Sequence, residues 1–140
     1  MIFLVRHADF SGHSPNPNLS DYGKQQSINL ANKIKKSFKT GVVTVWTSPA
    51  NCAKETAEII KYQMQIKDMI IEEKLWSDKN HSYDFYWLKQ KLCAFEGEIL
   101  IIISHLEYVR QFPASGLGFY FNEAGFAEGV LITNGKCLNF

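Results

Sequence analysis

The stretch IFLVRH at residues 2–7 is a short apolar run that ends directly in Arg6 and His7. A second stretch, ILIIISH at residues 99–105, repeats this arrangement and ends in Ser104 and His105. Short, wholly apolar runs are typical of strands buried on both faces of a parallel sheet. Because ligands of open α/β sheets gather at the carboxyl ends of strands, we expect the two histidines to share one site.

Short apolar runs alternate with longer amphipathic ones along the rest of the chain, which is typical of β-α units and a mostly parallel sheet. Serine is favoured at helix N-caps, and proline is tolerated in a first helical turn. Apolar residues at helical spacing indicate the buried face of a helix. The further predicted elements are strands at residues 42–46 and 69–72, and helices that start at Ser20, run from Pro49 to about Met64, and cover residues 85–95.

The C-terminal region has a different pattern. Asn134-Gly135 lies between the runs 129–133 and 136–140, and this dipeptide is the strongest short-range signal for a hairpin. The predicted fold is therefore a three-layer α/β/α sandwich whose mostly parallel central sheet ends in a C-terminal antiparallel hairpin. No repeat or linker divides the chain, so residues 1–140 are expected to form a single domain.

Composition restricts the classes of partner and location. Apolar residues make up 46% of the chain and charged residues 21%, and the net charge of +1 does not favour nucleic acid or an acidic membrane as a partner. No segment has the length of a signal peptide or a membrane span. The three cysteines, Cys52, Cys93 and Cys137, show no CxxC spacing, so we expect reduced thiols in a cytoplasmic protein.

Four segments, taken in order, resemble the histidine phosphatase superfamily, also called phosphoglycerate-mutase-like. Each one alone is a weak match, whereas the four in this order and spacing are fairly specific. The segments are Phe3-Leu4-Val5-Arg6-His7-Ala8, in which alanine replaces the family's glycine; Leu19 to Gln26; Thr47-Ser48-Pro49 followed by Ala53 and Thr56-Ala57-Glu58; and Ile102-Ile103-Ser104-His105 continuing to Val109-Arg110.

The resemblance implies a phosphatase that works without metal or cofactor. In the family the first histidine attacks phosphorus and carries the phosphoryl group, and that role falls here on His7. The resemblance makes Arg6 and His105 the other catalytic residues, because an anionic transition state needs preorganised charge and donors. It places Arg6, His105, His13 and Leu106 in the phosphate-binding set, with His105 opening a helix whose free N–H groups favour anions.

The chain departs from the family pattern in three further respects, one of which is His13, at a position where larger members have an asparagine near the substrate. Cys52 occupies the position of the family's second phosphate-binding arginine, and only Arg6 and Arg110 are arginines in this sequence. The loss of one such donor costs about 10²–10³ in rate in other enzymes. The usual general-acid position falls on Ser77, so the candidate acids are its neighbour Asp78 and Asp9, two residues after His7.

Three functions remain open at this point. The first is a phosphatase acting through a phosphohistidine intermediate on a phosphoprotein or a small phosphorylated metabolite, with activity attenuated by Cys52. The second is an inactive module of the same fold that binds phosphate or a phosphorylated ligand. The third is a metal-dependent hydrolase with His7, Asp9, His13 and His105 as ligands. The sequence predicts neither the substrate nor the oligomeric state.

Overall fold

The structure is a computed structural model that describes residues 1–76, 83–120 and 124–140. Its elements alternate between strands and helices, as the sequence pattern predicts. In chain order they are β1 (Ile2–Arg6), α1 (Asp21–Lys36), β2 (Val43–Thr47), α2 (Asn51–Met64), β3 (Met69–Ile71), the 3₁₀ turn η1 (Glu73–Leu75), α3 (Phe85–Cys93), β4 (Ile99–Ser104), α4 (Leu106–Leu117), β5 (Gly129–Thr133) and β6 (Lys136–Asn139).

The strands form one sheet in the order β3-β2-β4-β1-β5-β6. Strands β3, β2, β4 and β1 run parallel, whereas β5 pairs antiparallel with both β1 and β6. The apolar strand β4 is buried along its whole length between β2 and β1. The predicted mostly parallel sheet with an antiparallel C-terminal pair is confirmed.

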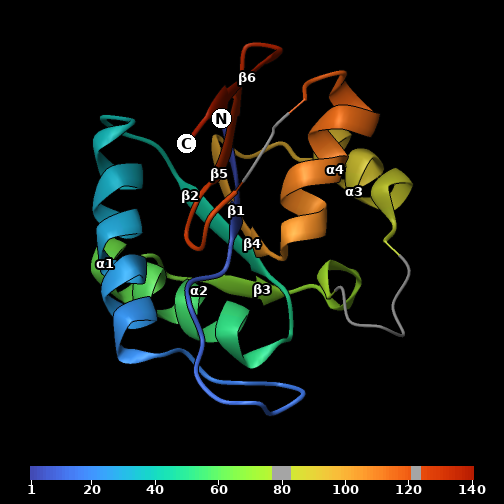
Figure 1. Ribbon diagram of the computed structural model, residues 1–140. Helices are drawn as coiled ribbons and strands as arrows, with labels where there is room; N and C mark the ends of the chain where they lie inside the picture. The colour runs from blue at the N-terminus through green and yellow to red at the C-terminus, as the bar shows by residue number, and fades with distance from the viewer. Residues whose placement is uncertain (77–82, 121–123) are drawn as a thin grey trace.

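Helices cover both faces of the sheet, α1 and α2 on one side and α3 and α4 on the other (Figure 1). Successive residues of a strand point to opposite faces. Ile101 and Ile103 of β4 therefore join the core beneath α1 and α2, while Leu100 and Ile102 join the core beneath α3 and α4. Two buried faces explain why this strand has no polar alternation.

Helix α1 begins where the sequence predicts, with Ser20 as its N-cap. The Ser20 hydroxyl accepts a hydrogen bond from the Gly23 backbone N–H at 2.9 Å. Gly23 must be glycine, because a Cβ there would lie 1.9 Å from the Asp9 carbonyl oxygen. The close approach packs the chain that follows β1 directly against the first turn of α1.

Helix α2 begins at Asn51, two residues later than the prediction from Pro49. The physical reason is local hydrogen bonding before the helix. The Ala50 N–H donates to the Ser48 hydroxyl at 3.3 Å, and the Asn51 N–H donates to Asn16 Oδ1 at 2.7 Å. The chain therefore turns through Pro49 before its first helical residue.

Helix α3 ends at Cys93, so Phe95 lies outside the predicted helical stripe. Its ring instead packs edge-on against Trp46 of β2, with the ring centroids 5.7 Å apart. None of the helices in the described ranges is long and apolar enough to cross a membrane. The three cysteines are unpaired.

The C-terminal hairpin has the geometry that its turn residues predict. Asn134 has φ of 49° and Gly135 has φ of 70°. Two consecutive left-handed residues are what a two-residue type I′ turn requires. The turn joins β5 to β6, and β5 in turn pairs with β1, the strand that precedes His7.

Candidate active site

The two strand-end histidines lie side by side. His7 directly follows β1 and His105 directly follows β4, and the register of these neighbouring strands places Arg6 opposite Ser104. The imidazole centroids are 5.1 Å apart, with the ring planes inclined at 66°. The expected juxtaposition of the two histidines at one edge of the sheet is confirmed.

The His7 ring is held in one tautomer. Its Nδ1 lies 2.8 Å from the carbonyl oxygen of Ala8, and a carbonyl can only accept, so Nδ1 carries the proton. The neutral ring therefore has its lone pair on Nε2. His7 is only 5% exposed, and this burial is the main cause that lowers its pKa, with the Arg6 charge acting in the same direction. Both effects favour a neutral, nucleophilic imidazole near pH 7.

Helix α2 fixes the backbone immediately after His7. The Ala8 N–H donates to the Thr56 hydroxyl at 3.1 Å, and that hydroxyl donates to the Cys52 carbonyl oxygen at 2.7 Å. Thr56 is fully buried. The Thr56-Ala57-Glu58 segment quoted above thus has a local task, which is to tie the first turns of α2 to the chain that presents His7.

His105 directly precedes the first residue of α4. It is the N-cap of α4, and its Nε2 lies 2.9 Å from the hydroxyl of the fully buried Ser48. Ser48 therefore orients the His105 ring, a role that the sequence analysis did not assign. Leu106 is the first residue of α4, and the free N–H groups of a first helical turn attract anions.

Arg6 is the arginine of this site. Its Nη1 donates to the carbonyl oxygen of Ala124 at 3.1 Å, and its guanidinium carbon lies 3.9 Å from the ring centroid of Phe126. Burial lowers the pKa of Arg6, and the nearby carboxylate of Glu107 opposes that shift. Nε has no hydrogen-bond partner within residues 1–76, 83–120 and 124–140. A guanidinium has five N–H donors and stays charged, so capacity remains for an anion.

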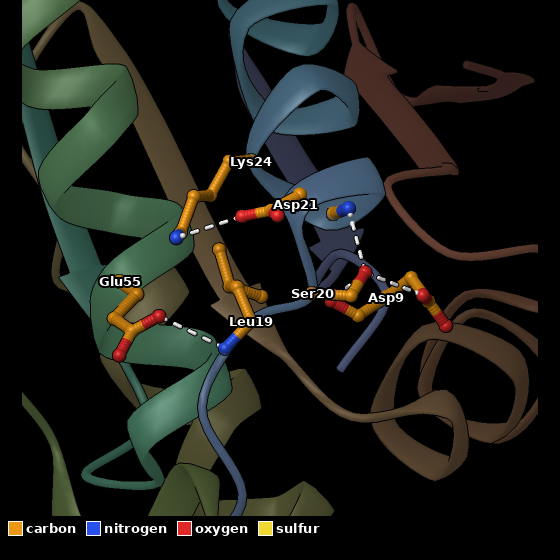
Figure 2. A network of polar contacts seen from close by, with 7 residues as sticks. Asp9, Leu19, Ser20, Asp21, Lys24 and Glu55 are labelled. Carbon is orange, nitrogen blue, oxygen red and sulfur yellow. Dashed lines mark hydrogen bonds and ion pairs between the residues drawn. The ribbon is translucent and has the colours of Figure 1, made fainter. Parts of the chain in front are cut away.

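Asp9, one candidate acid, is engaged at the start of α1. Its Oδ2 accepts from the Ser20 hydroxyl at 2.6 Å, and its backbone N–H donates to Gln26 Oε1 at 2.9 Å. Figure 2 shows this carboxylate directed to Ser20 at the foot of α1. Its charge nevertheless opposes, in small part, the lowering of the His7 and Arg6 pKa values by burial. Asp78, the other candidate, lies outside the described residues.

His13 lies on an exposed loop, residues 11–18. An antiparallel β-bridge between Phe10 and Leu19 joins the two ends of the loop. Within the loop, Asn16 Oδ1 accepts a hydrogen bond from the Asn51 N–H at the start of α2. Leu19 is held further by Glu55 of α2, whose carboxylate accepts from the Leu19 N–H at 2.9 Å (Figure 2). Within the described chain, His13 is not joined to the paired histidines by a hydrogen bond or ring contact, so its predicted part in phosphate binding stays a prediction.

Cys52 lies in the first turn of α2 and is only 4% exposed. It packs in the core beneath α1 and α2, and burial raises the pKa of its thiol to about 11. The side chain is therefore an uncharged thiol at neutral pH. Arg110 is exposed on α4, which leaves Arg6 to supply guanidinium chemistry. No three histidine, cysteine or acidic side chains among the residues described converge as metal ligands, so the alternative His7, Asp9, His13 and His105 set is not assembled.

Two phenylalanines and one glutamate near His7 escaped the sequence analysis. The Phe10 and Phe126 rings lie 5.8 and 5.7 Å from the His7 ring, and 5.8 Å from each other. The charge of Glu107, in the first turn of α4, opposes part of the lowering of the Arg6 and His7 pKa values that burial causes. Glu107 follows His105 by two residues and could have been found as a first-turn acid, whereas nothing in the local sequence singles out Phe126.

A family model supports what this geometry indicates. The model described as histidine phosphatase superfamily (branch 1) matches residues 2–76, more than half of the chain. The chain belongs to the histidine phosphatase superfamily. The matched segment contains Arg6, His7, Cys52 and Thr56, and His105 lies beyond it.

Solved structures share the superfamily fold at low identity. The protein histidine phosphatase SixA complexed with tungstate has a TM-score of 0.82 at 20% identity, over 99% of this chain and 93% of its own. A mycobacterial glucosyl-3-phosphoglycerate phosphatase has a TM-score of 0.70 at 11% identity, over 91% and 86%. A phosphoserine phosphatase from Entamoeba histolytica in complex with phosphoserine has a TM-score of 0.63 at 15% identity, over 99% and 93%.

These likenesses show the fold of this superfamily member. No curated protein matches the sequence. The alignment of Cys52 with the family's second phosphate-binding arginine stays a prediction.

Proposed function

We propose that this histidine phosphatase superfamily member is a metal-independent phosphatase with His7 as its nucleophile. The observation that carries the proposal is the arrangement of His7, whose Nδ1 proton is held by the Ala8 carbonyl while the ring of His105 lies 5.1 Å away. This leaves the Nε2 lone pair of His7 for attack on phosphorus. The leaving group takes its electron pair as the bond between phosphorus and Nε2 forms.

Water completes the cycle. It adds to phosphorus, the bond from phosphorus to Nε2 breaks, and inorganic phosphate and one proton leave. The phosphorylated ring carries positive charge while its Nδ1 proton still points at the Ala8 carbonyl oxygen, so the same contact supports both forms of His7. The ring then returns to its neutral tautomer.

Arg6 and the N-terminus of α4 supply positive charge around the phosphoryl group, and the His105 ring beside His7 supplies a polar contact. Preorganised donors of this kind act where charge develops in the transition state. Because Cys52 provides an uncharged thiol where the superfamily pattern has an arginine, we expect activity lower by about 10²–10³ than with both arginines.

The substrate proposed is a phosphoprotein or a small phosphorylated metabolite. Solved relatives include a protein histidine phosphatase and a phosphoserine phosphatase, which supports both kinds of substrate for the fold. Asp9 and Asp78 remain the candidate donors of a proton to the leaving group, and Asp9 would have to release its bond from Ser20 to act. A substrate with a good leaving group needs little such help.

The second candidate function is an inactive module that binds phosphate. The uncharged thiol of Cys52 and the engagement of Asp9 by Ser20 favour it. Steady-state hydrolysis of p-nitrophenyl phosphate by the wild type and by His7→Asn separates the two functions. The asparagine amide can still donate to the Ala8 carbonyl but offers no nucleophile.

The phosphatase proposal expects turnover by the wild type that His7→Asn reduces to background, with unchanged rates in chelator. Turnover that survives His7→Asn overturns the assignment of His7. Absence of turnover together with saturable binding of orthovanadate supports the binding module instead. Loss of activity in chelator, restored by a divalent metal, supports the metal-dependent alternative.

A further inference from the structure

Residues 124–128 hold Arg6 and His7 by five contacts, of which three are hydrogen bonds and two involve the Phe126 ring. In the backbone, the Arg6 N–H donates to the Glu128 carbonyl oxygen at 2.9 Å, and the Ala127 N–H donates to the His7 carbonyl oxygen at 3.2 Å. At the side chains, Arg6 Nη1 donates to the Ala124 carbonyl oxygen at 3.1 Å, and the Phe126 ring contacts Arg6 and His7. We call residues 124–128 the clamp.

Phe126 is the side chain of the clamp that touches both site residues. The Arg6 guanidinium carbon lies over its ring at 3.9 Å from the centroid, and the His7 centroid lies 5.7 Å away. A guanidinium stacked on an aromatic face is attracted to the ring while its N–H donors point outward from the edge of the plane. The Phe126 ring therefore restrains the Arg6 guanidinium and leaves its N–H groups available to donate to an anion.

The backbone of the clamp is strained. Ala127 has φ of 57°, a left-handed conformation that is uncommon for any residue with a Cβ. The same residue supplies the N–H that reaches the His7 carbonyl. Such outliers persist where the surrounding structure imposes them, and they cluster at functional sites.

The restraint is more important here than in a site with two arginines. Cys52 is a buried, uncharged thiol, so Arg6 is the guanidinium available to the phosphoryl group. When one guanidinium contacts the phosphoryl group, no second guanidinium can compensate if the first moves away. The placement of Arg6 must therefore come from its surroundings, and the clamp provides both a carbonyl acceptor and an aromatic face.

We propose that Phe126 is a positioning residue that holds the Arg6 guanidinium against the phosphoryl group bound at His7. The inference rests on the proposed phosphatase function for its kinetic consequence. The predicted effect on anion binding does not depend on the phosphatase function, because Arg6 would also contact a phosphate analogue in an inactive module.

The test compares Phe126→Leu and Phe126→Met, which keep apolar bulk, with Phe126→Tyr, which keeps the aromatic face. Phe140→Leu is the matched control, because Phe140 also stacks on a cation, Lys33 at 4.4 Å, and packs against Phe3. Each variant is measured for kcat and KM on p-nitrophenyl phosphate, for orthovanadate Kd, and for the His7 pKa by NMR titration.

The expected result follows from the strength of a partly desolvated cation–π contact. Phe126→Leu and Phe126→Met lower kcat and weaken orthovanadate binding by about 3- to 30-fold. The His7 pKa rises in both variants, because the Arg6 charge that lowers it is no longer held beside the ring. For Phe126→Tyr, kcat and the orthovanadate Kd stay within about threefold of the wild-type values. For Phe140→Leu, both equal the wild-type values.

The proposal is overturned if both aliphatic variants keep the wild-type kcat and orthovanadate Kd, or if Phe126→Tyr loses as much as they do. A wild type without His7-dependent turnover would overturn the proposed phosphatase function alone. In that case the orthovanadate Kd and the His7 pKa still decide the role of Phe126.

Discussion

The substitution Cys52→Arg tests the prediction that position 52, in the first turn of α2, corresponds to the second phosphate-binding arginine of the superfamily. Cys52 and Arg6 each influence the other's pKa, and we expect an arginine side chain at position 52 to extend from the core toward the phosphoryl site. A single well-placed donor is worth about 10²–10³ in kcat, or roughly 2.7–4 kcal/mol. We therefore expect kcat/KM on p-nitrophenyl phosphate to rise at least tenfold.

Burial opposes part of this gain. Cys52 is 4% exposed and packs in the core with Ala53 and Ala57, so a much larger side chain must leave the core or displace its neighbours. Overpacking of a well-packed core costs typically 1–3 kcal/mol. For a domain of this size we expect Tm to fall by about 3–10 °C while activity rises. A gain in rate with a loss in stability is the signature of an arginine at the site.

Two matched variants isolate the guanidinium. Cys52→Met adds bulk without charge and is expected to lower Tm without raising kcat/KM. Cys52→Lys adds a point charge without a planar fork, and its rate should lie between those of methionine and arginine. If Cys52→Arg is no faster than Cys52→Met while remaining folded, Cys52 does not occupy the arginine position and the alignment over α2 is wrong.

Three other outcomes follow from the contacts of the two histidines. His7 must be neutral to attack, and burial lowers its pKa from the ordinary 6.5. We therefore expect kcat/KM to be retained at pH 6.5 and to decline only at lower pH. A decline of kcat/KM that begins above pH 6.5 as the pH falls would contradict this. Ser48→Ala removes the hydrogen bond between Ser48 and the His105 ring, and steady-state kinetics should show kcat lower by about 3- to 10-fold with little loss of stability. An unchanged kcat would mean that Ser48 does not orient the ring. Thr56→Val leaves the buried Ala8 N–H without its acceptor, so urea unfolding should show a loss of about 1–3 kcal/mol, and a loss below about 0.5 kcal/mol argues against that bond.

The sheet and the meeting of the two histidines could be predicted because they depend on short segments. β1 and β4 are wholly apolar, which indicates strands buried on both faces, and parallel neighbours place their carboxyl ends at one edge. A histidine that follows each strand must then lie at that edge. Likewise Ser20 and Asn134-Gly135 specify a helix start and a hairpin turn through their own hydrogen bonding and backbone preferences.

The surroundings of Arg6 could not be predicted in this way. Phe126 is far from Arg6 in the sequence and reaches it because β5 pairs antiparallel with β1 and because Ala127 adopts a left-handed conformation. Neither the register nor the strained turn has a local sequence signal. The hydrogen bond between Asp9 and Ser20 could not be predicted for a similar reason. The sequence predicts Ser20 as an N-cap, which accepts from the Gly23 N–H. That the same hydroxyl also donates to the Asp9 carboxylate follows only from how α1 packs against the chain after β1.

The nucleophile itself can be identified directly. The protein is mixed with a phosphoryl donor and quenched within one turnover, and the phosphorylated residue is located by mass spectrometry and its ring nitrogen by NMR. The account predicts an acid-labile phosphoryl group on Nε2 of His7 that is absent from His7→Asn. A phosphoryl group on Nδ1, on His105 or on Cys52 would contradict it.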